Sequence, residues 1–256
     1  MKALITGGTS GIGYGVAQQL AAQNWDVTIV GRNQLRGEQI AKEINGRFRQ
    51  ADLSLMSETN MLAANISEPV DALILCAGAL IDEKTSTTKE GLEPTFALNY
   101  LSRFVLSQQL LDRITPNGRI IMVSGNGKHK NSSTDWQAQQ SGFAAAFKAA
   151  LAVDLYAAEF ARRNNSAQIH TCYPGWVKTN LLQNTAFPMQ LMTNLFASSI
   201  AKGSSYLVRL TTADHKTVHW NKAKPMTFSP PLPYQEEASR LWDYSQQLVE
   251  EITAVS

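Results

Sequence analysis

A glycine-rich loop near the start of the chain has the residue types that bind a pyrophosphate. The segment TGGTSGIGYG places Gly7, Gly11 and Gly13 between an apolar run and a helical pattern. Glycines allow a tight turn there and let the backbone approach a phosphate, whose charge the N-terminus of the helix stabilises. Because a strand pattern precedes the loop and a helix pattern follows it, the segment predicts a dinucleotide site; the alternative is a purely structural turn.

The residue after the second apolar run bears on which dinucleotide binds. About twenty residues beyond the glycine loop, an NAD site carries an acidic side chain for the ribose hydroxyls. This chain has Gly31, Arg32 and Asn33 at that point. A guanidinium suits a 2′-phosphate, so the sequence predicts NADP(H). The alternative is an ordinary exposed arginine.

A single lysine interrupts an apolar helical run. Lys148 lies in SGFAAAFKAALAV, residues 141–153. Taken alone, this segment favours a surface lysine whose stem covers apolar side chains while its ammonium stays in water.

The elements that must position these groups follow one pattern. Apolar runs of strand length alternate with helical patterns, and the runs are KALIT, DVTIVG, DALILCAG, GRIIMVSG and AQIHTCYPG. Their near-continuous apolar character indicates a parallel sheet covered on both faces. We therefore predict one α/β domain over residues 1–256, with a doubly wound, Rossmann-like parallel sheet. Helices are predicted at 11–22, 34–44, 54–66, 94–114, 136–163 and 234–252, and long loops at 124–135 and 203–231.

Composition excludes several classes of protein. Charged residues make up 17% and the net charge is +2, which argues against a nucleic-acid platform and favours a small-molecule ligand. No apolar stretch is long enough for a membrane span and no secretory signal is visible, so we expect a cytoplasmic protein. The sequence predicts that Cys76 and Cys172 are buried thiols, which fits a reducing compartment. The histidines lack the spacing of metal ligands, and no metal is predicted.

The chain resembles the short-chain dehydrogenases/reductases over essentially its whole length. The motifs that carry the resemblance are TGGTSGIG, ADL (51–53), LCAG (75–78), LNY, IIMVSG, Lys148 and PGWVKT (174–179). Within that family it is most similar to the retinol-dehydrogenase-like group, through EGLEPTFALNYLSRFVLSQQLL and SPPLPYQEEASRLWDYSQQL.

The resemblance implies roles along the cofactor. Asp52 and Leu53 would flank the adenine, Ala77 and Gly78 would lie along the cofactor, and Thr179 would approach the nicotinamide carboxamide. The expected cofactor-binding residues are Gly7, Thr9, Ser10, Gly11, Ile12, Gly13, Arg32, Asp52, Leu53, Ala77, Gly78, Asn99, Lys148, Pro174, Gly175, Val177 and Thr179.

The resemblance also implies catalytic roles. Asn99 would belong to the proton-relay helix, Ser124 would hydrogen-bond the reacting oxygen, and Lys148 would hold the nicotinamide ribose and lower the pKa of a catalytic tyrosine. The family's tyrosine stands four residues before the lysine, one helical turn away. Here that position is Ala144, which cannot move a proton.

Three explanations of Ala144 remain open: an engineered substitution, a proton from another group, or a scaffold without redox chemistry. The candidate acids are His129, Tyr156, Tyr173 and Lys148 itself, of which Lys148 and Tyr173 rank first. Cys76 is a further departure, since the family usually has asparagine before Ala-Gly. The leading function is an NADP(H)-dependent oxidoreductase. The alternatives are a non-redox enzyme for cyclisation, isomerisation or elimination, and an NADP-binding protein without turnover.

Residues 181–207 are rich in Leu, Met and Phe and stand where the family places its substrate lid. Such side chains suit an adaptable apolar pocket and hence an apolar-to-amphipathic organic substrate. The alternative is an ordinary amphipathic helix on the core. The helices predicted at 94–114 and 136–163 are the family's usual dimer surfaces, so a homodimer is expected by analogy.

Overall fold

A computed structural model describes residues 1–81, 87–127, 134–140, 142–164, 166–178, 197–213, 216–226, 228 and 234–255. Among these residues no helix combines the length and apolar character that crossing a bilayer requires.

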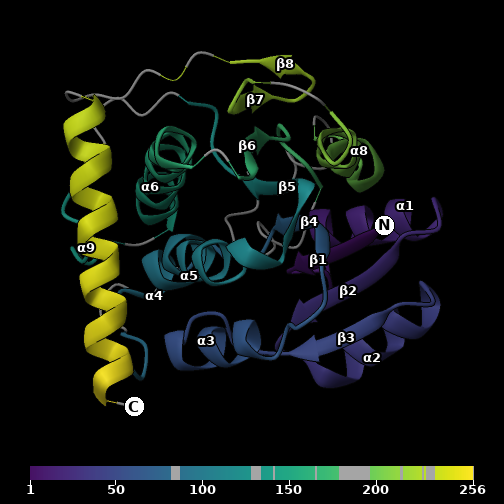
Figure 1. Ribbon diagram of the computed structural model, residues 1–256, viewed down its shortest axis with the longest axis horizontal. Helices are drawn as coiled ribbons and strands as arrows, with labels where there is room; N and C mark the ends of the chain where they lie inside the picture. Colours follow the sequence, from purple (N-terminus) through teal and green to yellow (C-terminus); the bar gives the residue numbers. More distant parts are fainter. Residues whose placement is uncertain are drawn as a thin grey trace.

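An eight-stranded sheet in the order β3-β2-β1-β4-β5-β6-β7-β8 forms the centre of the molecule (Figure 1). Its strands are β1 (Lys2–Thr6), β2 (Asp26–Gly31), β3 (Arg47–Gln50), β4 (Val70–Leu75), β5 (Ile114–Val123), β6 (Gln168–Tyr173), β7 (His219–Asn221) and β8 (Lys224–Pro225). Neighbouring strands pair in parallel except for the hairpin β7–β8, which is antiparallel. The order 3-2-1-4-5-6 is that of a doubly wound sheet, so the predicted fold class is confirmed.

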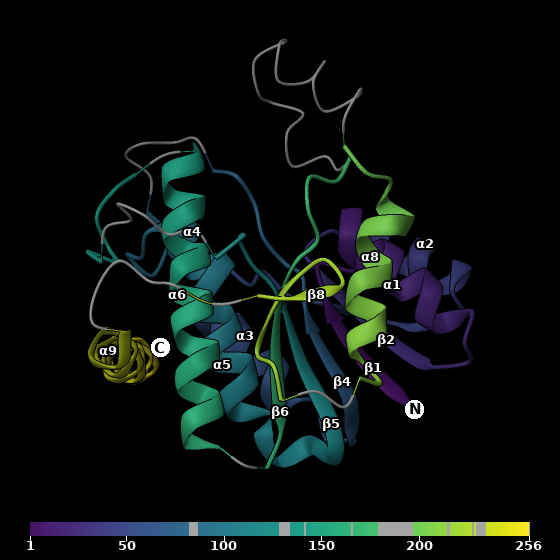
Figure 2. The same cartoon turned by 90° about the horizontal axis from the view of Figure 1, so that it is seen from above.

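Helices cover both faces of the sheet (Figure 2). One face carries α1 (Gly11–Ala21), α2 (Gln34–Glu43) and α8 (Ile200–Leu210), and the other carries α3 (Met56–Ala64), α5 (Ser102–Gln109) and α6 (Gly142–Arg163). Strand residues alternate between the faces: in β4, Leu73 and Leu75 join the core under α5 and α6, whereas Ala72 and Ile74 join the core under α1. The strands must therefore be apolar at nearly every position.

Several boundaries differ from the sequence-based prediction. Residues 94–114 are not one helix but α4 (Pro94–Phe96), the π-helix η1 (Ala97–Leu101), α5 and the 3-10 helix η2 (Leu111–Arg113), after which β5 begins at Ile114. The helix predicted from 136 begins at 142. The long loop predicted at 203–231 is wrong, because this stretch contains most of α8 and the hairpin β7–β8.

A long helix close to the end of the sequence, α9 (Tyr234–Val255), packs along α6 and reaches α3 (Figure 1). The ring of Trp242 stacks on Tyr156 at 5.4 Å between centroids and meets Phe104 edge-on at 5.7 Å. The hydroxyls of Tyr100 and Ser245 lie 2.8 Å apart. Helix α9 thus occupies the aromatic face of α5 and α6, on which the family resemblance placed a dimer contact.

Candidate functional site

The glycine loop packs directly against the carboxyl end of β4. Gly7 has a φ of +66°, and a Cβ added there would lie 2.8 Å from the Cα of Ala77. A Cβ at Gly13 would lie 2.4 Å from the carbonyl oxygen of Gly7. Only glycine therefore fits these two positions, where the loop packs against the segment after β4 and turns into α1. Ser10, the N-cap residue of α1, makes no side-chain hydrogen bond to the first turn.

Two arginines follow β2 near this loop, where Gly31 lies against Thr9. Arg32 follows β2 directly and is exposed, and its carbonyl accepts a hydrogen bond from the Gln50 side-chain amide at 3.0 Å; its role toward NADP(H) stays a prediction. Arg36, one helical turn further on, donates from Nε to the carbonyl of Thr9 at 2.7 Å. Our sequence reasoning missed Arg36, although its spacing of four residues from Arg32 at a helix start was a usable signal.

The segment after β3 is ordered by its own polar groups. The carboxylate of Asp52 accepts from the Ser54 amide at 3.0 Å and from the Ser54 hydroxyl at 2.7 Å. Leu53 is buried. The Asp52 carboxylate therefore fixes the turn that leads to α3, and any contact of these residues with adenine stays a prediction.

Asn99 lies in the π-helix η1 and holds the segment after β4. Its side-chain oxygen accepts from the amide of Ala79 at 2.9 Å, and its side-chain nitrogen donates to the carbonyl of Ala79 at 3.0 Å. A Cβ at Gly78 would lie 3.3 Å from the Asn99 oxygen. π-Helical turns are frequent at functional sites, and this one brings Asn99 beside Gly78.

Ser124 and Tyr173 lie at the same edge of the sheet. The Ser124 amide donates to the carbonyl of Cys172 at 3.0 Å, and its hydroxyl donates to the carbonyl of Ala150 in α6 at 3.2 Å. Tyr173, partly buried at the end of β6, accepts the amide of Lys222 at its carbonyl at 2.7 Å. The structure therefore groups Ser124 with α6, the element that carries Lys148.

Lys148 is only 1% exposed, so the interpretation as a lysine with its ammonium in water is wrong. Its Nζ donates to the carbonyl of Ala138 at 2.7 Å and to that of Asp135 at 3.1 Å. Burial lowers its pKa, while the charges of Glu93 and Asp135 act in the opposite direction. An ammonium has three donors, and these two bonds leave one for another group.

The position four residues before Lys148 is exposed. Ala144 lies at the surface between Phe143 and Phe147, whose side chains are 43% and 56% exposed. The two phenylalanine rings are 6.4 Å apart between centroids. Tyr156, another candidate acid, is a core residue: its hydroxyl lies 2.5 Å from that of Ser107, and burial raises its pKa.

The remaining candidates divide between described and undescribed residues. Val177 forms an isolated bridge with Ser198, and Gly175 adopts a φ of +84°. His129 and Thr179 lie outside the described residues. Of the predicted lid, 181–196 also lies outside them, whereas the part from residue 200 belongs to α8, where the Gln19 side chain of α1 donates to Ser204 at 2.7 Å.

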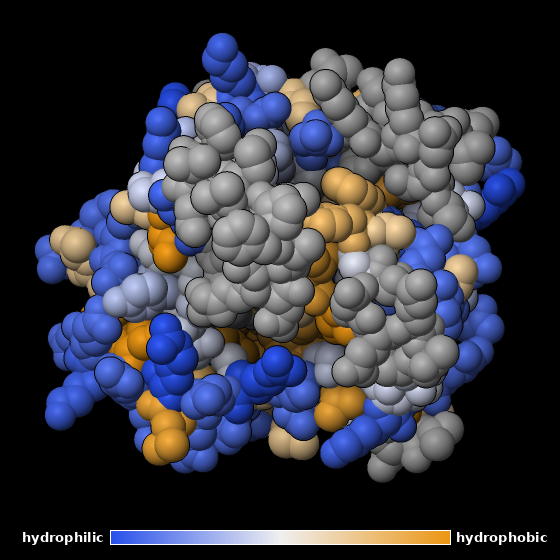
Figure 3. Space-filling view, turned by 180° about the vertical axis from the view of Figure 1, so that it is seen from behind, coloured by the Kyte–Doolittle hydropathy of each residue, from blue (hydrophilic) through white to orange (hydrophobic). Residues whose placement is uncertain are grey.

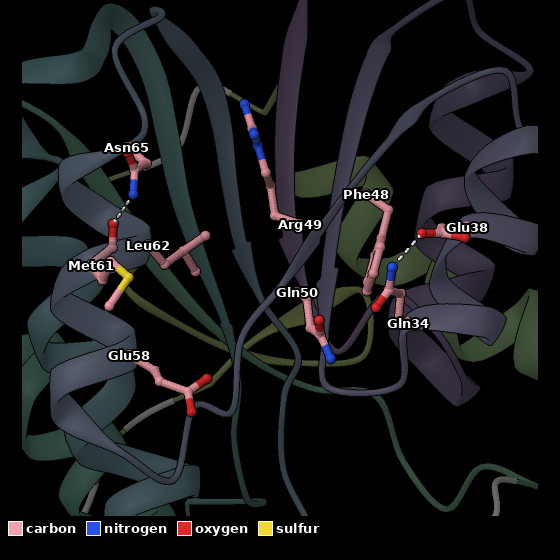
Figure 4. Close-up of a pocket in the computed structure, with 9 residues that line it drawn as sticks. All are labelled: Gln34, Glu38, Phe48, Arg49, Gln50, Glu58, Met61, Leu62 and Asn65. Atoms are coloured by element: carbon pink, nitrogen blue, oxygen red, sulfur yellow. Dashed lines mark hydrogen bonds between the residues drawn. The ribbon is translucent and has the colours of Figure 1, made fainter.

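The surface at the carboxyl ends of the strands carries an apolar area. Figure 3 shows this face, with orange side chains in its middle beside atoms drawn in grey and a mostly hydrophilic rim. A different groove, of about 490 Å³, lies along β3 between α2 and α3 (Figure 4). None of the predicted catalytic or cofactor-binding residues lines that groove; its lining is Gln34, Glu38, Phe48, Arg49, Gln50, Glu58, Met61, Leu62 and Asn65.

Residues 1–188 match the short chain dehydrogenase family, and the doubly wound sheet with the glycine loop at its carboxyl edge agrees with this match. The chain therefore belongs to that family. The chain is 28% identical to human retinol dehydrogenase 13, over 96% of this chain and 83% of the relative. Among solved structures, BdcA in complex with NADPH has a TM-score of 0.66 at 16% identity, covering 88% of this chain and 94% of that one. A short chain dehydrogenase from Burkholderia cenocepacia in complex with NADP has a TM-score of 0.67 at 20% identity, covering 86% and 94%.

Proposed function

We propose that the protein is an NADP(H)-dependent oxidoreductase that transfers hydride between the nicotinamide and an apolar carbonyl or alcohol substrate. The observation that carries the proposal is the tight glycine turn before α1, with the Arg36 guanidinium bonded to the Thr9 carbonyl of this loop and Arg32 just after β2. A Cβ at Gly7 or Gly13 would strike Ala77 or the Gly7 carbonyl, so only glycine permits this tight turn. The turn leads directly to the N-terminus of α1, where a pyrophosphate would bind. Two structural neighbours are described with NADP or NADPH bound, which supports this choice of cofactor.

Several described residues at this edge of the sheet suit the parts of the cofactor. The N-terminus of α1 would receive the pyrophosphate, Arg32 and Arg36 the 2′-phosphate, and the third donor of Lys148 the nicotinamide ribose. When bound, the nicotinamide supplies or accepts the hydride. Ser124 would exchange its bond to the Ala150 carbonyl for one to the substrate oxygen, which would orient the carbonyl and stabilise its developing charge.

Position 144 has no tyrosine that could donate a proton to the substrate oxygen. Lys148 is buried with a lowered pKa, which makes its ammonium a stronger acid than a surface lysine. We therefore rank Lys148 first as the proton donor, with Tyr173 at the neighbouring strand end as the second candidate. The expected substrate is apolar, in keeping with the apolar area at this edge (Figure 3).

The cofactor proposal is tested by titrating NADPH and NADH with the purified protein and following nucleotide fluorescence. NADPH should bind more tightly, and Arg32→Ala and Arg36→Ala should each weaken NADPH without affecting NADH. Each charge-assisted contact is worth about 1.5–3 kcal/mol, or roughly a factor of 10–100 in affinity. Arg209→Ala, an exposed arginine of α8, is the matched control. Equal affinities for the two nucleotides would refute the choice of NADP(H).

Ala144 favours a second candidate, a non-redox reaction that uses the same cleft. Ala144→Tyr separates the two, because position 144 is exposed and stands one helical turn before Lys148. In a reductase that lacks its acid, the substitution should raise carbonyl reduction by roughly 10²–10⁴. In a non-redox enzyme it should fill space that the substrate uses and lower turnover, while NADPH binding survives.

A further inference from the structure

Arg103 is a buried cation that the proposed chemistry does not use. It lies in α5 with 5% of its surface exposed, and no described acidic side chain pairs with it within ion-pair distance. Burial lowers its pKa to about 10, against the opposing effects of Cys76 and Asp154, so it stays charged at neutral pH. Burying a charge costs several kcal/mol, and an apolar side chain of similar length would fill this space without that cost.

The guanidinium of Arg103 joins two neighbouring strands just where their ladders end. Its Nη2 donates to the carbonyl of Ala77 at 2.8 Å, and its Nη1 donates to the carbonyl of Val123. Strand β4 ends at Leu75 and β5 ends at Val123. The fork of a guanidinium spans two acceptors that a single ammonium cannot hold in the same geometry.

Both carbonyls belong to segments of the candidate site. Ala77 packs against Gly7 and precedes Gly78, and Val123 precedes Ser124. A Cβ at Gly78 would lie 3.5 Å from the Arg103 Nη2. The Nε of Arg103 is buried and makes no hydrogen bond within the described part of the chain, so the two carbonyl bonds are the only hydrogen bonds of this guanidinium there.

We propose that Arg103 is a positioning residue that fixes the segment from Ala77 to Gly78, against which the cofactor would lie, relative to the Ser124 hydroxyl. The inference deepens the proposed function and rests on it, because it assumes that these two segments face the nucleotide and the substrate oxygen. It differs from ordinary core packing in what it predicts: the loss of Arg103 should loosen two separate segments of one edge together.

The test compares Arg103→Met, which keeps the stem and removes the fork, with Arg103→Lys, which keeps the charge and reaches one carbonyl. Arg113→Met, in the exposed turn after α5, is the matched control. Each protein is studied well below its unfolding temperature by amide hydrogen exchange, by NADPH titration and by the split between kcat and KM for carbonyl reduction. For Arg103→Met we expect faster exchange at 77–79 and at 124–126, NADPH affinity lower by roughly tenfold, and kcat lower by about 10- to 100-fold.

Arg103→Lys should fall between the wild type and Arg103→Met, and it carries the test if the methionine variant does not fold. A lowered unfolding temperature with unchanged exchange at both segments, unchanged NADPH affinity and unchanged kcat would overturn the proposal and leave Arg103 as a core cation. A wild-type protein that binds neither NADPH nor NADH would instead remove the proposed function. Hydrogen exchange on the nucleotide-free protein would then still decide whether Arg103 fixes both segments.

Discussion

Replacing Lys148 by methionine tests what this buried ammonium does in the folded protein. The lysine is 1% exposed, and its two hydrogen bonds hold the segment of residues 134–140 against α6. Beside it, Trp136 stacks on Phe96 at 6.2 Å between ring centroids, and the Gln137 side chain accepts the amide of Glu93 at 3.0 Å. Lys148→Met should therefore loosen this segment as well as remove the proposed contact to the cofactor.

The magnitude follows from the partners. A hydrogen bond to a charged group contributes about 1.5–3 kcal/mol. The cost of burying the ammonium offsets several kcal/mol of what the two hydrogen bonds of Lys148 contribute together. Asp135 is exposed, so its carbonyl can bond water once the ammonium is gone, whereas Ala138 is half-buried. We expect a net loss of about 1–3 kcal/mol in the free energy of unfolding, against at most about 0.5 kcal/mol for a surface lysine.

Urea titration of the nucleotide-free proteins measures this loss, with the exposed Lys42 of α2 mutated to methionine as the control. The pH dependence has a definite sign. Because the pKa of Lys148 is lowered in the folded protein, the folded state releases this proton before the unfolded chain does. Wild-type stability should therefore rise relative to Lys148→Met as the pH approaches 10.5, the ordinary value. A difference below 0.5 kcal/mol and parallel pH profiles would refute the assigned contacts.

Three further predictions follow from other parts of the structure. Burial raises the pKa of Cys76 and of Cys172 to about 12, so at pH 9 iodoacetamide should label neither thiol in the native protein and both in urea; rapid native labelling would contradict that burial. Because α9 covers the aromatic face of α5 and α6 and has a polar outer surface, light scattering should give the mass of one chain, and a stable dimer would contradict this. Trp242→Ala, which opens the contact of α9 with α5 and α6, should lower the free energy of unfolding by about 3–5 kcal/mol. Lys222 has a φ of +55° at the tip of the hairpin β7–β8, so Lys222→Gly should raise the free energy of unfolding by up to about 1 kcal/mol. A clearly lower unfolding temperature of the glycine variant would contradict this and show that the lysine side chain stabilises the turn.

The central strands could be predicted from sequence because a two-sided core demands continuous apolar residues, as in β1, β4 and β5. Strand β3 could not, since RFRQ is polar and largely exposed, and it forms through its pairing with β2. The break of residues 94–114 into four pieces was equally hidden, because the apolar pattern runs through a π-helical turn and directly into β5.

The site divides in a similar way. Glycines at this spacing between a strand and a helix indicate a tight turn by themselves, so the role of Gly7 and Gly13 could be predicted from the sequence. The partners of Lys148 are carbonyls of a segment without a regular pattern, and no rule based on side chains could find them. Arg103 was missed although it is the one charged residue in SRFVLS, a stretch that is otherwise apolar or hydroxyl-bearing; that signal was available.

The packing of α9 also bears on how the chain is made. Helix α6 ends at residue 163 and α9 begins at residue 234, so 70 residues separate the two elements that close the aromatic face. At 5–20 residues per second, a ribosome needs about 4–14 seconds to add them. During that interval Tyr100, Phe104 and Tyr156 lack the cover that α9 provides. A nascent chain in this state exposes an apolar surface to chaperones or to another nascent chain. Slow synthesis of residues 164–233 should therefore lower the yield of native protein even when the finished protein is stable.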